Sequence, residues 1–202
     1  MTGSVLRDLR DLRVQVVHPP DEEGKSLVEH LKRIGCMVDA GWPIPDSPSP
    51  QADILVLAIN FDAREEIRKL LRAHGDLRAA LIAIVDYENP STLQLVLESG
   101  ALAVIEKPIR PFGLLTNVIL ARSLWLERRK TDRKLQKLEA KVSGMQKIQR
   151  AKAILMQSQQ MSEDEAHSTI RKQAMSKRTS MEDMAIAIIN ANELLTTKFP
   201  RS

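Results

Sequence analysis

The stretch Asp53-Ile-Leu-Val-Leu-Ala-Ile59 decides the fold class, because it places six apolar residues in a row directly after one acid. An apolar run of about 4–8 residues between amphipathic segments is typical of a strand in a βαβ unit, and hence of a parallel sheet. Further apolar runs and amphipathic segments cover residues 14–17, 27–34, 67–71, 81–85, 93–97 and 101–105. The sequence therefore predicts an α/β domain whose sheet has five parallel strands.

A proline-rich segment, 41–50, lies between the second predicted strand and the third. Its prolines occupy positions 43, 45, 48 and 50. Proline has no backbone N–H to donate to a strand ladder or to the interior of a helix. We therefore expect a loop here.

Residues with catalytic or metal-binding chemistry form no recognisable set in the sequence. Cys36 is the only cysteine, which excludes an internal disulfide, and we expect it to be a buried, unreactive thiol. The four histidines, at positions 18, 30, 74 and 167, lack the spacing of metal ligands, and the sequence has no glycine-rich phosphate loop. We therefore expect no enzyme activity, no metal site and no cofactor.

Charge is distributed unevenly along the chain. Residues 1–121 carry 13 Lys and Arg against 17 Asp and Glu, whereas residues 122–202 carry 17 against 9. A polyanion would therefore bind the second part. No apolar run approaches the roughly 20 residues that cross a bilayer, and the charged N-terminus lacks the apolar core of a secretion signal. We expect a cytoplasmic protein with no membrane partner.

From Phe112 onward the strand pattern gives way to a helical pattern. An apolar seam with alternating spacings of three and four residues predicts a two-helix coiled coil, flanked by Lys, Arg and Glu. A single amphipathic helix packed on its own sheet is the alternative, because Arg128 and Thr131 interrupt the seam. Gly144 is not expected to end this helix. The predicted dimerisation residues are Leu124, Thr131, Leu135, Leu138, Val142 and Met145.

The last 55 residues predict three helices. Ile148, Ala151 and Leu155 form the apolar stripe of the first helix. Ser162 and Glu165 have the spacing of a capping box that opens the second helix, and Ser180 caps the third. Small alanines at positions 166, 174 and 185 allow the helices to approach closely. We therefore expect a compact three-helix bundle.

The fragment Gly100-Ala-Leu-Ala-Val-Ile-Glu-Lys-Pro108 and the strand pattern resemble the receiver domains of bacterial response regulators, which have a flavodoxin-like fold. In that family the third strand carries two Asp residues separated by four apolar residues, and the second Asp accepts the phosphoryl group. This chain has Ala58 at that position. The segment 18–20, His-Pro-Pro, replaces the acids that hold a divalent cation, and Lys107 alone remains. The resemblance implies a pseudo-receiver with a degenerate phosphorylation site.

The segment Ile148-Gln-Arg-Ala-Lys-Ala-Ile-Leu-Met156 and the alanines at 151, 166, 174 and 185 resemble the ANTAR domain, the RNA-binding unit of transcription antitermination regulators. Together with the receiver-like part and the coiled coil, the whole chain resembles the AmiR-like regulators. The resemblance implies a homodimer that binds hairpins in leader mRNA and prevents the terminator hairpin from forming. It also implies control by a small-molecule-sensing regulatory protein of the AmiC type, docked on the pseudo-receiver domain.

Basic and polar side chains of the C-terminal bundle are the predicted RNA contacts. They are Lys147, Gln149, Arg150, Lys152, Arg171, Lys172, Met175, Lys177 and Arg178. Lysine and arginine bind phosphates and make binding salt-dependent, and the dipole of a helix favours cations at its C-terminus. Met175 fits a core position equally well. The basic residues of 128–141 are expected to form a solvated face of the coiled coil.

The sequence thus predicts a pseudo-receiver domain at 1–120, a dimerisation helix at 121–147 and an RNA-binding domain at 148–198. Two other functions fit the pattern. One is a response regulator that binds DNA through a C-terminal helix-turn-helix, and the other is a protein-binding adaptor. Glu182 and Asp183 argue against the DNA reader, because the start of a recognition helix contacts bases and phosphates.

Overall fold

The computed structural model describes residues 9–74, 79–86 and 90–197. The chain divides into two compact units, Met1–Arg129 (unit 1) and Lys130–Ser202 (unit 2). One helix, α4 (Pro111–Gln159), contributes residues to both units. In the described part of the chain, no helix combines the length and the apolar character that a membrane span requires.

Unit 1 contains a five-stranded parallel sheet in the order β2-β1-β3-β4-β5. The sheet confirms the α/β fold that the sequence predicts, and β3 begins and ends where the apolar run does. The strands are β1 (Arg13–Val17), β2 (Met37–Gly41), β3 (Ile54–Ile59), β4 (Ala80–Val85) and β5 (Ala103–Glu106). The helices of this unit are α1 (Glu22–Arg33), the short 3-10 helix η1 (Phe61–Ala63), α2 (Arg64–His74), α3 (Pro90–Ser99) and the first part of α4.

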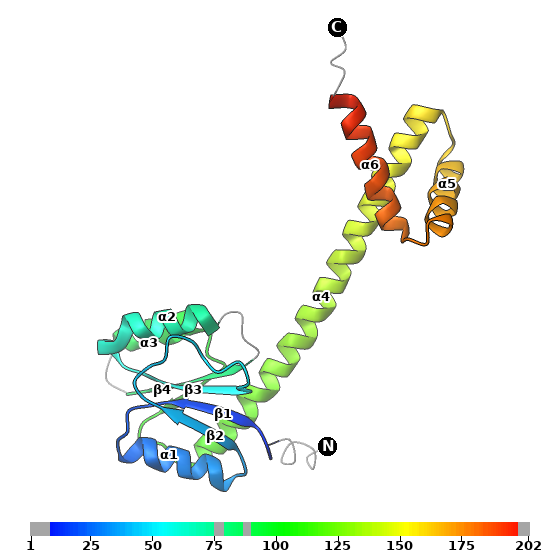
Figure 1. Ribbon diagram of the computed structural model, residues 1–202. Coiled ribbons are helices and arrows are strands. Elements are labelled where there is room, and N and C mark those ends of the chain that lie inside the picture. Colours follow the sequence, from blue (N-terminus) through cyan, green and yellow to red (C-terminus); the bar gives the residue numbers. More distant parts are fainter. Residues whose placement is uncertain (1–8, 75–78, 87–89, 198–202) are drawn as a thin grey trace. The chain divides into compact units, whose positions relative to one another are not determined.

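Helices cover both faces of this sheet (Figure 1). Because side chains alternate along a strand, Val56 of β3 faces α1 and α4, whereas Leu55 and Leu57 face α2 and α3. All six residues of β3 are buried, which explains why the strand is apolar throughout rather than alternating. The sheet therefore has two hydrophobic cores, one on each face.

The proline-rich segment forms the predicted loop, since no strand or helix lies between Gly41 and Ile54. The strand before this loop, β2, stands at the edge of the sheet, and its residues are mostly exposed. Cys36, just before β2, is buried as expected, and burial raises the pKa of its thiol to about 11.

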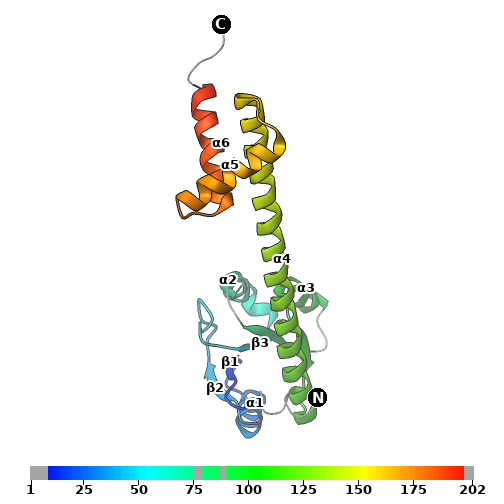
Figure 2. The same ribbon diagram turned by 90° about the vertical axis from the view of Figure 1, so that its right-hand side faces the viewer.

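Unit 2 is built from the C-terminal part of α4, α5 (Glu163–Ser176) and α6 (Met181–Thr197) (Figure 2). The predicted alanines lie in its core, where they let the three helices approach. The buried residues are Ala151, Leu155, Ala166, Ile170, Ala174, Met184, Ala185 and Ile189. Ser162 and Glu165 form the predicted capping box, and the Ser180 hydroxyl accepts the Asp183 N–H at 3.0 Å.

The predicted coiled-coil helix and the first helix of the bundle are one uninterrupted helix of 49 residues. Gly144 lies inside it and does not end it, as expected. Its surroundings were not expected: Gly144 is buried, and a Cβ atom there would lie 2.8 Å from Glu182 Oε2. The glycine thus permits α6 to begin close to α4.

Candidate nucleic-acid interface and degenerate receiver site

Ala58 occupies the position of the phosphoacceptor near the C-terminal end of β3. It pairs in register with Ile84 of β4, and its side chain is buried. A methyl group offers neither a nucleophile nor a cation ligand at this edge of the sheet. In the described residues, no group of three or more His, Cys, Asp or Glu side chains has the arrangement of a metal site.

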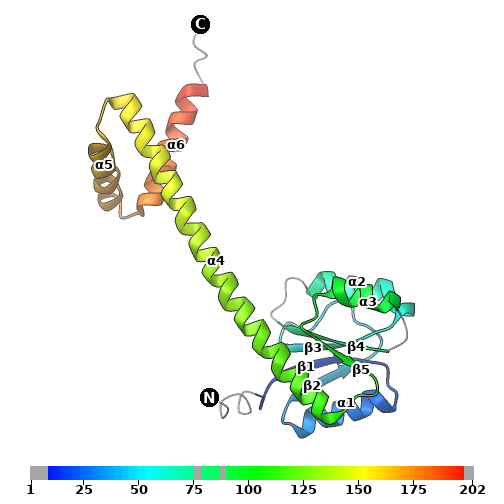
Figure 3. The ribbon, with the colours of Figure 1, turned by 180° about the vertical axis from the view of Figure 1, so that it is seen from behind.

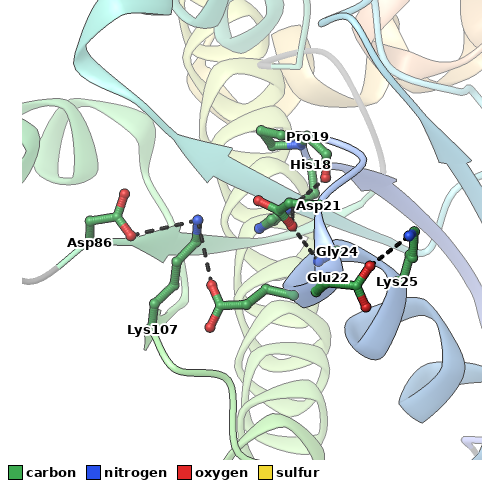
Figure 4. Close-up of polar contacts among 9 residues, drawn as sticks. His18, Pro19, Asp21, Glu22, Gly24, Lys25, Asp86 and Lys107 are labelled. Atoms are coloured by element: carbon green, nitrogen blue, oxygen red, sulfur yellow. Dashed lines mark hydrogen bonds and ion pairs between the residues drawn. The ribbon is translucent and has the colours of Figure 1, made fainter.

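Lys107 follows β5 at the same edge, and two acids flank it. Its Nζ atom lies 3.6 Å from Asp86 Oδ1 and 3.7 Å from Glu23 Oε2 (Figure 4). Asp86 follows β4, and its side chain is 65% exposed although it contacts the lysine. Glu23 belongs to the first turn of α1, so sequence order gave no sign of this contact. The lysine that remains from the family pattern thus has replacement carboxylates.

The start of α1 is fixed by a side-chain cap beside this cluster. Asp21 Oδ1 accepts the N–H of Gly24 at 2.7 Å, and this hydrogen bond is the main reason why the pKa of Asp21 is lowered (Figure 4). Lys25 Nζ lies 2.7 Å from Glu22 Oε1 on the next turn. The segment after β1 therefore forms a helix cap rather than a phosphate site.

Asp53 lies at the opposite edge of the sheet, before β3. Its Oδ1 atom is 2.9 Å from Nη2 of Arg122 on α4, and its Oδ2 atom accepts the N–H of Arg13 at 3.2 Å. Trp125 makes cation–π contacts with two guanidinium groups, since the Cζ atoms of Arg122 and Arg129 each lie 5.0 Å from the centroid of its ring. The ion pair between Arg122 and Asp53 attaches α4 to the sheet, near the end of the segment of α4 that belongs to unit 1.

The predicted dimerisation seam is exposed along α4. Its apolar members are 40% to 60% exposed, and Thr131 between them is exposed as well. They are Leu124, Leu135, Leu138, Val142 and Met145. Within unit 2, Ala151 and Leu155 pack into the bundle while Val142 and Met145 do not. The helix thus presents two different faces, one buried in the bundle and one apolar but uncovered.

Three of the predicted RNA contacts have acidic partners inside unit 2. Lys147 Nζ lies 2.6 Å from Glu182 Oε1, Arg150 Nη2 lies 2.8 Å from Glu193 Oε1, and Lys152 Nζ lies 2.5 Å from Glu163 Oε1. The pairs join α4 to α6 and to the start of α5. The side chain of Lys152 is only 8% exposed, which leaves little of it for a ligand.

The other predicted contacts are exposed. Met175 is 70% exposed, so it is not a core residue. Gln149 is also exposed, on α4. Figure 3 shows α5 and the turn that follows it. Four exposed cations of this segment form no ion pair in the described part of the chain: Arg171, Lys172, Lys177 and Arg178. These four cations and Met175 are exposed and close in sequence, and we name them together the α5 surface.

The turn after α5 has an unusual backbone. Arg178 has a φ of 54°, in the left-handed region that glycine favours. The Thr179 N–H donates to the Ala174 carbonyl and the Arg178 N–H donates to the Met175 carbonyl, the pattern of a Schellman motif. An arginine therefore occupies a position where glycine would fit without strain.

Two family models match the chain. The model described as "AmiR, N-terminal" matches residues 12–122, and the ANTAR domain model matches residues 136–189. The chain belongs to the AmiR family. It is thus a transcription regulator with a receiver-like part and an ANTAR domain. The ANTAR match begins within the part of α4 that carries the seam, ahead of the boundary at 148 that the sequence suggested.

A curated relative supports this membership, and a solved structure supports the fold. The aliphatic amidase regulator of Pseudomonas aeruginosa is 37% identical over 178 residues, which cover 87% of this chain and 90% of that protein. The transcriptional regulatory protein PdtaR of Mycobacterium tuberculosis is 21% identical over 68% of this chain and 67% of that protein. The structure of the response regulator StyR superposes with a TM-score of 0.56 at 17% identity, covering 89% of this chain and 98% of that one. The StyR likeness concerns the fold alone.

Proposed function

We propose that this protein is a transcription antitermination regulator whose ANTAR domain binds hairpins in leader mRNA through the α5 surface. The observation that carries the proposal is the group of four exposed cations on α5 and its following turn, near Met175 in sequence, which form no ion pair with any residue that the structure describes. Such cations neutralise phosphates, and an exposed thioether offers apolar contact to an unstacked loop base. A protein that binds one of two alternative RNA folds more tightly shifts the RNA population toward that fold. The size of the shift is set by the difference in affinity for the two folds.

Lys147, Arg150 and Lys152 have a different role in this proposal. Each is held by a carboxylate, and a phosphate would have to displace that carboxylate in order to bind. We therefore assign them to the orientation of α4, α5 and α6. Gln149 is exposed and stays a predicted RNA contact.

The exposed seam of α4 supports a homodimer. Its residues follow the a and d positions of a heptad repeat, and apolar residues exposed at this spacing are typical of a coiled-coil seam. Two ANTAR domains carried on one coiled coil would bind two hairpins of the same transcript, which raises the apparent affinity through effective concentration.

Control by a small-molecule-sensing partner of the AmiC type is the remaining part of the proposal. Ala58 cannot accept a phosphoryl group, so the pseudo-receiver has no covalent input at this position. Docking of a sensor protein on unit 1 would supply the input instead. The purified regulator should then be active alone and lose RNA affinity when the partner is added.

A binding series tests the proposed function directly. The full chain is titrated with hairpin RNA from the leader of its own operon and with duplex DNA of the same sequence, at several salt concentrations. We expect tighter binding to the RNA, with an affinity that falls steeply as salt rises. Tighter binding to the DNA would favour the helix-turn-helix response regulator, and binding to neither would favour the protein-binding adaptor.

A further inference from the structure

Charged side chains flank the exposed seam of α4 on both sides. When Leu135 takes position a and Leu138 takes position d of a heptad, positions e and g lie beside the seam, where they contact the partner helix of a coiled coil. Opposite charges at these positions stabilise one orientation of the two helices, and like charges disfavour it. The charged residues are Asp132 and Glu139 at e, and Glu127, Lys134 and Lys141 at g.

These flanking side chains are not used within the chain itself. All of them are exposed, and none forms an ion pair with another residue that the structure describes. The described ion pairs of α4 involve other side chains, which are Arg122, Lys147, Arg150 and Lys152. The charges beside the seam are therefore available to a second copy of the helix.

A parallel dimer with the two helices in register brings opposite charges together. Each g residue then lies beside the e residue of the following heptad in the second copy, so Lys134 faces Glu139, and the two-fold symmetry produces this pair twice. Glu127 faces Asp132, which is a pair of like charges. Arg128 at position a lies between them and supplies a cation on each helix. The parallel dimer thus has attraction at one level of the seam and partly compensated repulsion at the other.

An antiparallel dimer brings only like charges together at the centre of the seam. Residues at e then face e, and residues at g face g. In the register that keeps the whole seam paired, Lys134 faces Lys141 and Asp132 faces Glu139, each twice. A shift by one heptad in either direction shortens the paired seam and sets one lysine and one acid against the same residue of the second copy. The charges therefore favour the parallel dimer.

We propose that a second copy packs on the seam of α4 in parallel and in register, with Lys134 of each copy paired with Glu139 of the other. This orientation rests on the proposed function, which supplies the dimer itself. Residues 130–145 of the seam and the three-helix bundle belong to the same unit. A parallel seam therefore holds both bundles at the same end of the coiled coil, where the two α5 surfaces can bind hairpins that follow one another in one transcript.

Charge reversal at Lys134 distinguishes the two orientations, because it has opposite effects in them. In the parallel dimer Lys134→Glu faces Glu139 of the second copy and should raise the dissociation constant of the dimer about threefold or more. In the antiparallel dimer it would face Lys141 and lower that constant. Adding Glu139→Lys restores the parallel pair and should return the constant to the natural value. Lys130→Glu is the matched control, because it changes the net charge equally at an exposed position outside the seam and its flanks, and it should leave the constant unchanged.

Disulfide trapping tests the register of the two helices. Residues at position d meet their own copy across a parallel seam, so Leu138→Cys chains should form covalent dimers on mild oxidation. Thr131→Cys repeats the test at the preceding d position. Ala140→Cys lies on the outer side of the helix and is the control that should stay unlinked, as should the natural chain, whose only cysteine, Cys36, is buried.

Sedimentation of the natural full chain separates this orientation from the proposed function. A monomer overturns both. A dimer that Lys134→Glu strengthens overturns the parallel orientation and leaves the proposed dimer standing. The same conclusion follows if the chain is a dimer but neither Leu138→Cys nor Thr131→Cys forms covalent dimers.

Discussion

Nζ of Lys147 lies 2.6 Å from Oε1 of Glu182, although 35 residues separate them in the chain. Gly144, one turn before Lys147, makes room for the carboxylate, since a Cβ atom there would lie 2.8 Å from Glu182 Oε2. The glycine and the ion pair belong to one contact, in which the first turn of α6 packs on α4. The stability of unit 2 should therefore depend on the two positions together.

Gly144→Ala should reveal this coupling. Glycine inside a helix costs about 0.5–1 kcal/mol relative to alanine, but the new methyl group would displace the Glu182 carboxylate and disturb a half-exposed pair worth at most about 1 kcal/mol. We expect little net change in the natural background and stabilisation by about 0.5–1 kcal/mol in a Glu182→Ala background. Hydrogen exchange of the α6 amides measures both values. Equal stabilisation in the two backgrounds would show that the residues are not coupled.

Arg178→Gly should separate stability from binding. The left-handed backbone at Arg178 costs an L-residue about 1 kcal/mol, which glycine avoids. We expect unit 2 to become more stable, or at least no less stable, while RNA affinity falls and the salt dependence weakens by about one phosphate contact. Gln160→Gly is the control, because Gln160 has the same φ of 54° outside the α5 surface. Loss of RNA binding in the control, or none in Arg178→Gly, contradicts the assignment.

Local signals account for the parts of the fold that the sequence predicted. The limits of β3 follow from a run of apolar residues that must be buried on both faces. The start of α5 follows from Ser162 and Glu165, whose capping box involves neighbours in sequence. Each of these features is decided within a few residues, where spacing alone carries the information.

Contacts between distant segments were not predictable in the same way. The burial of Lys152 depends on where Glu163 lies after the chain turns, and the pair of Lys107 with Glu23 joins β5 to α1. A run of lysine and arginine gives only total charge, so it did not distinguish the α4 cations that form ion pairs from the α5 cations that form none among the described residues. For this reason the proposed set of RNA-binding cations is smaller than the set that the sequence predicted.

Unit 2 should lose stability as the pH falls below about 4.5. A hydrogen bond from the Ser162 backbone lowers the pKa of Glu165, and one from the Ser180 hydroxyl lowers that of Asp183. Groups with a lowered pKa in the folded state stabilise it above the ordinary values of 4.5 and 3.8, and that contribution disappears as the pH falls through the folded values.

Melting temperatures between pH 6 and pH 3 test this expectation. The natural chain should lose more in Tm over this range than the variant with Glu165→Gln and Asp183→Asn, whose two caps no longer titrate. Parallel curves for the two proteins would mean that other acids cause the pH dependence.

The seam of α4 should hold the dimer together. Leu135→Lys combined with Leu138→Lys places charges in the seam, and we expect sedimentation to report a monomer and RNA affinity to fall at least about 100-fold through loss of avidity. Leu126→Lys is the control, because Leu126 is a similarly exposed leucine outside the seam. A natural chain that sediments as a monomer would contradict the dimer, as would a seam variant that remains dimeric.

The most direct measurement compares two pairs of charge reversals in RNA binding. Arg171→Glu with Lys172→Glu changes the α5 surface, and Lys130→Glu with Lys137→Glu changes exposed cations of α4 by the same net charge. Dissociation constants for a leader hairpin are measured across salt concentrations. For the first pair the dissociation constant should rise steeply, and the salt dependence should fall by about two phosphate contacts. For the second pair the dissociation constant should rise little. Equal losses in the two pairs would contradict the account, because binding would then depend on total charge rather than on the α5 surface.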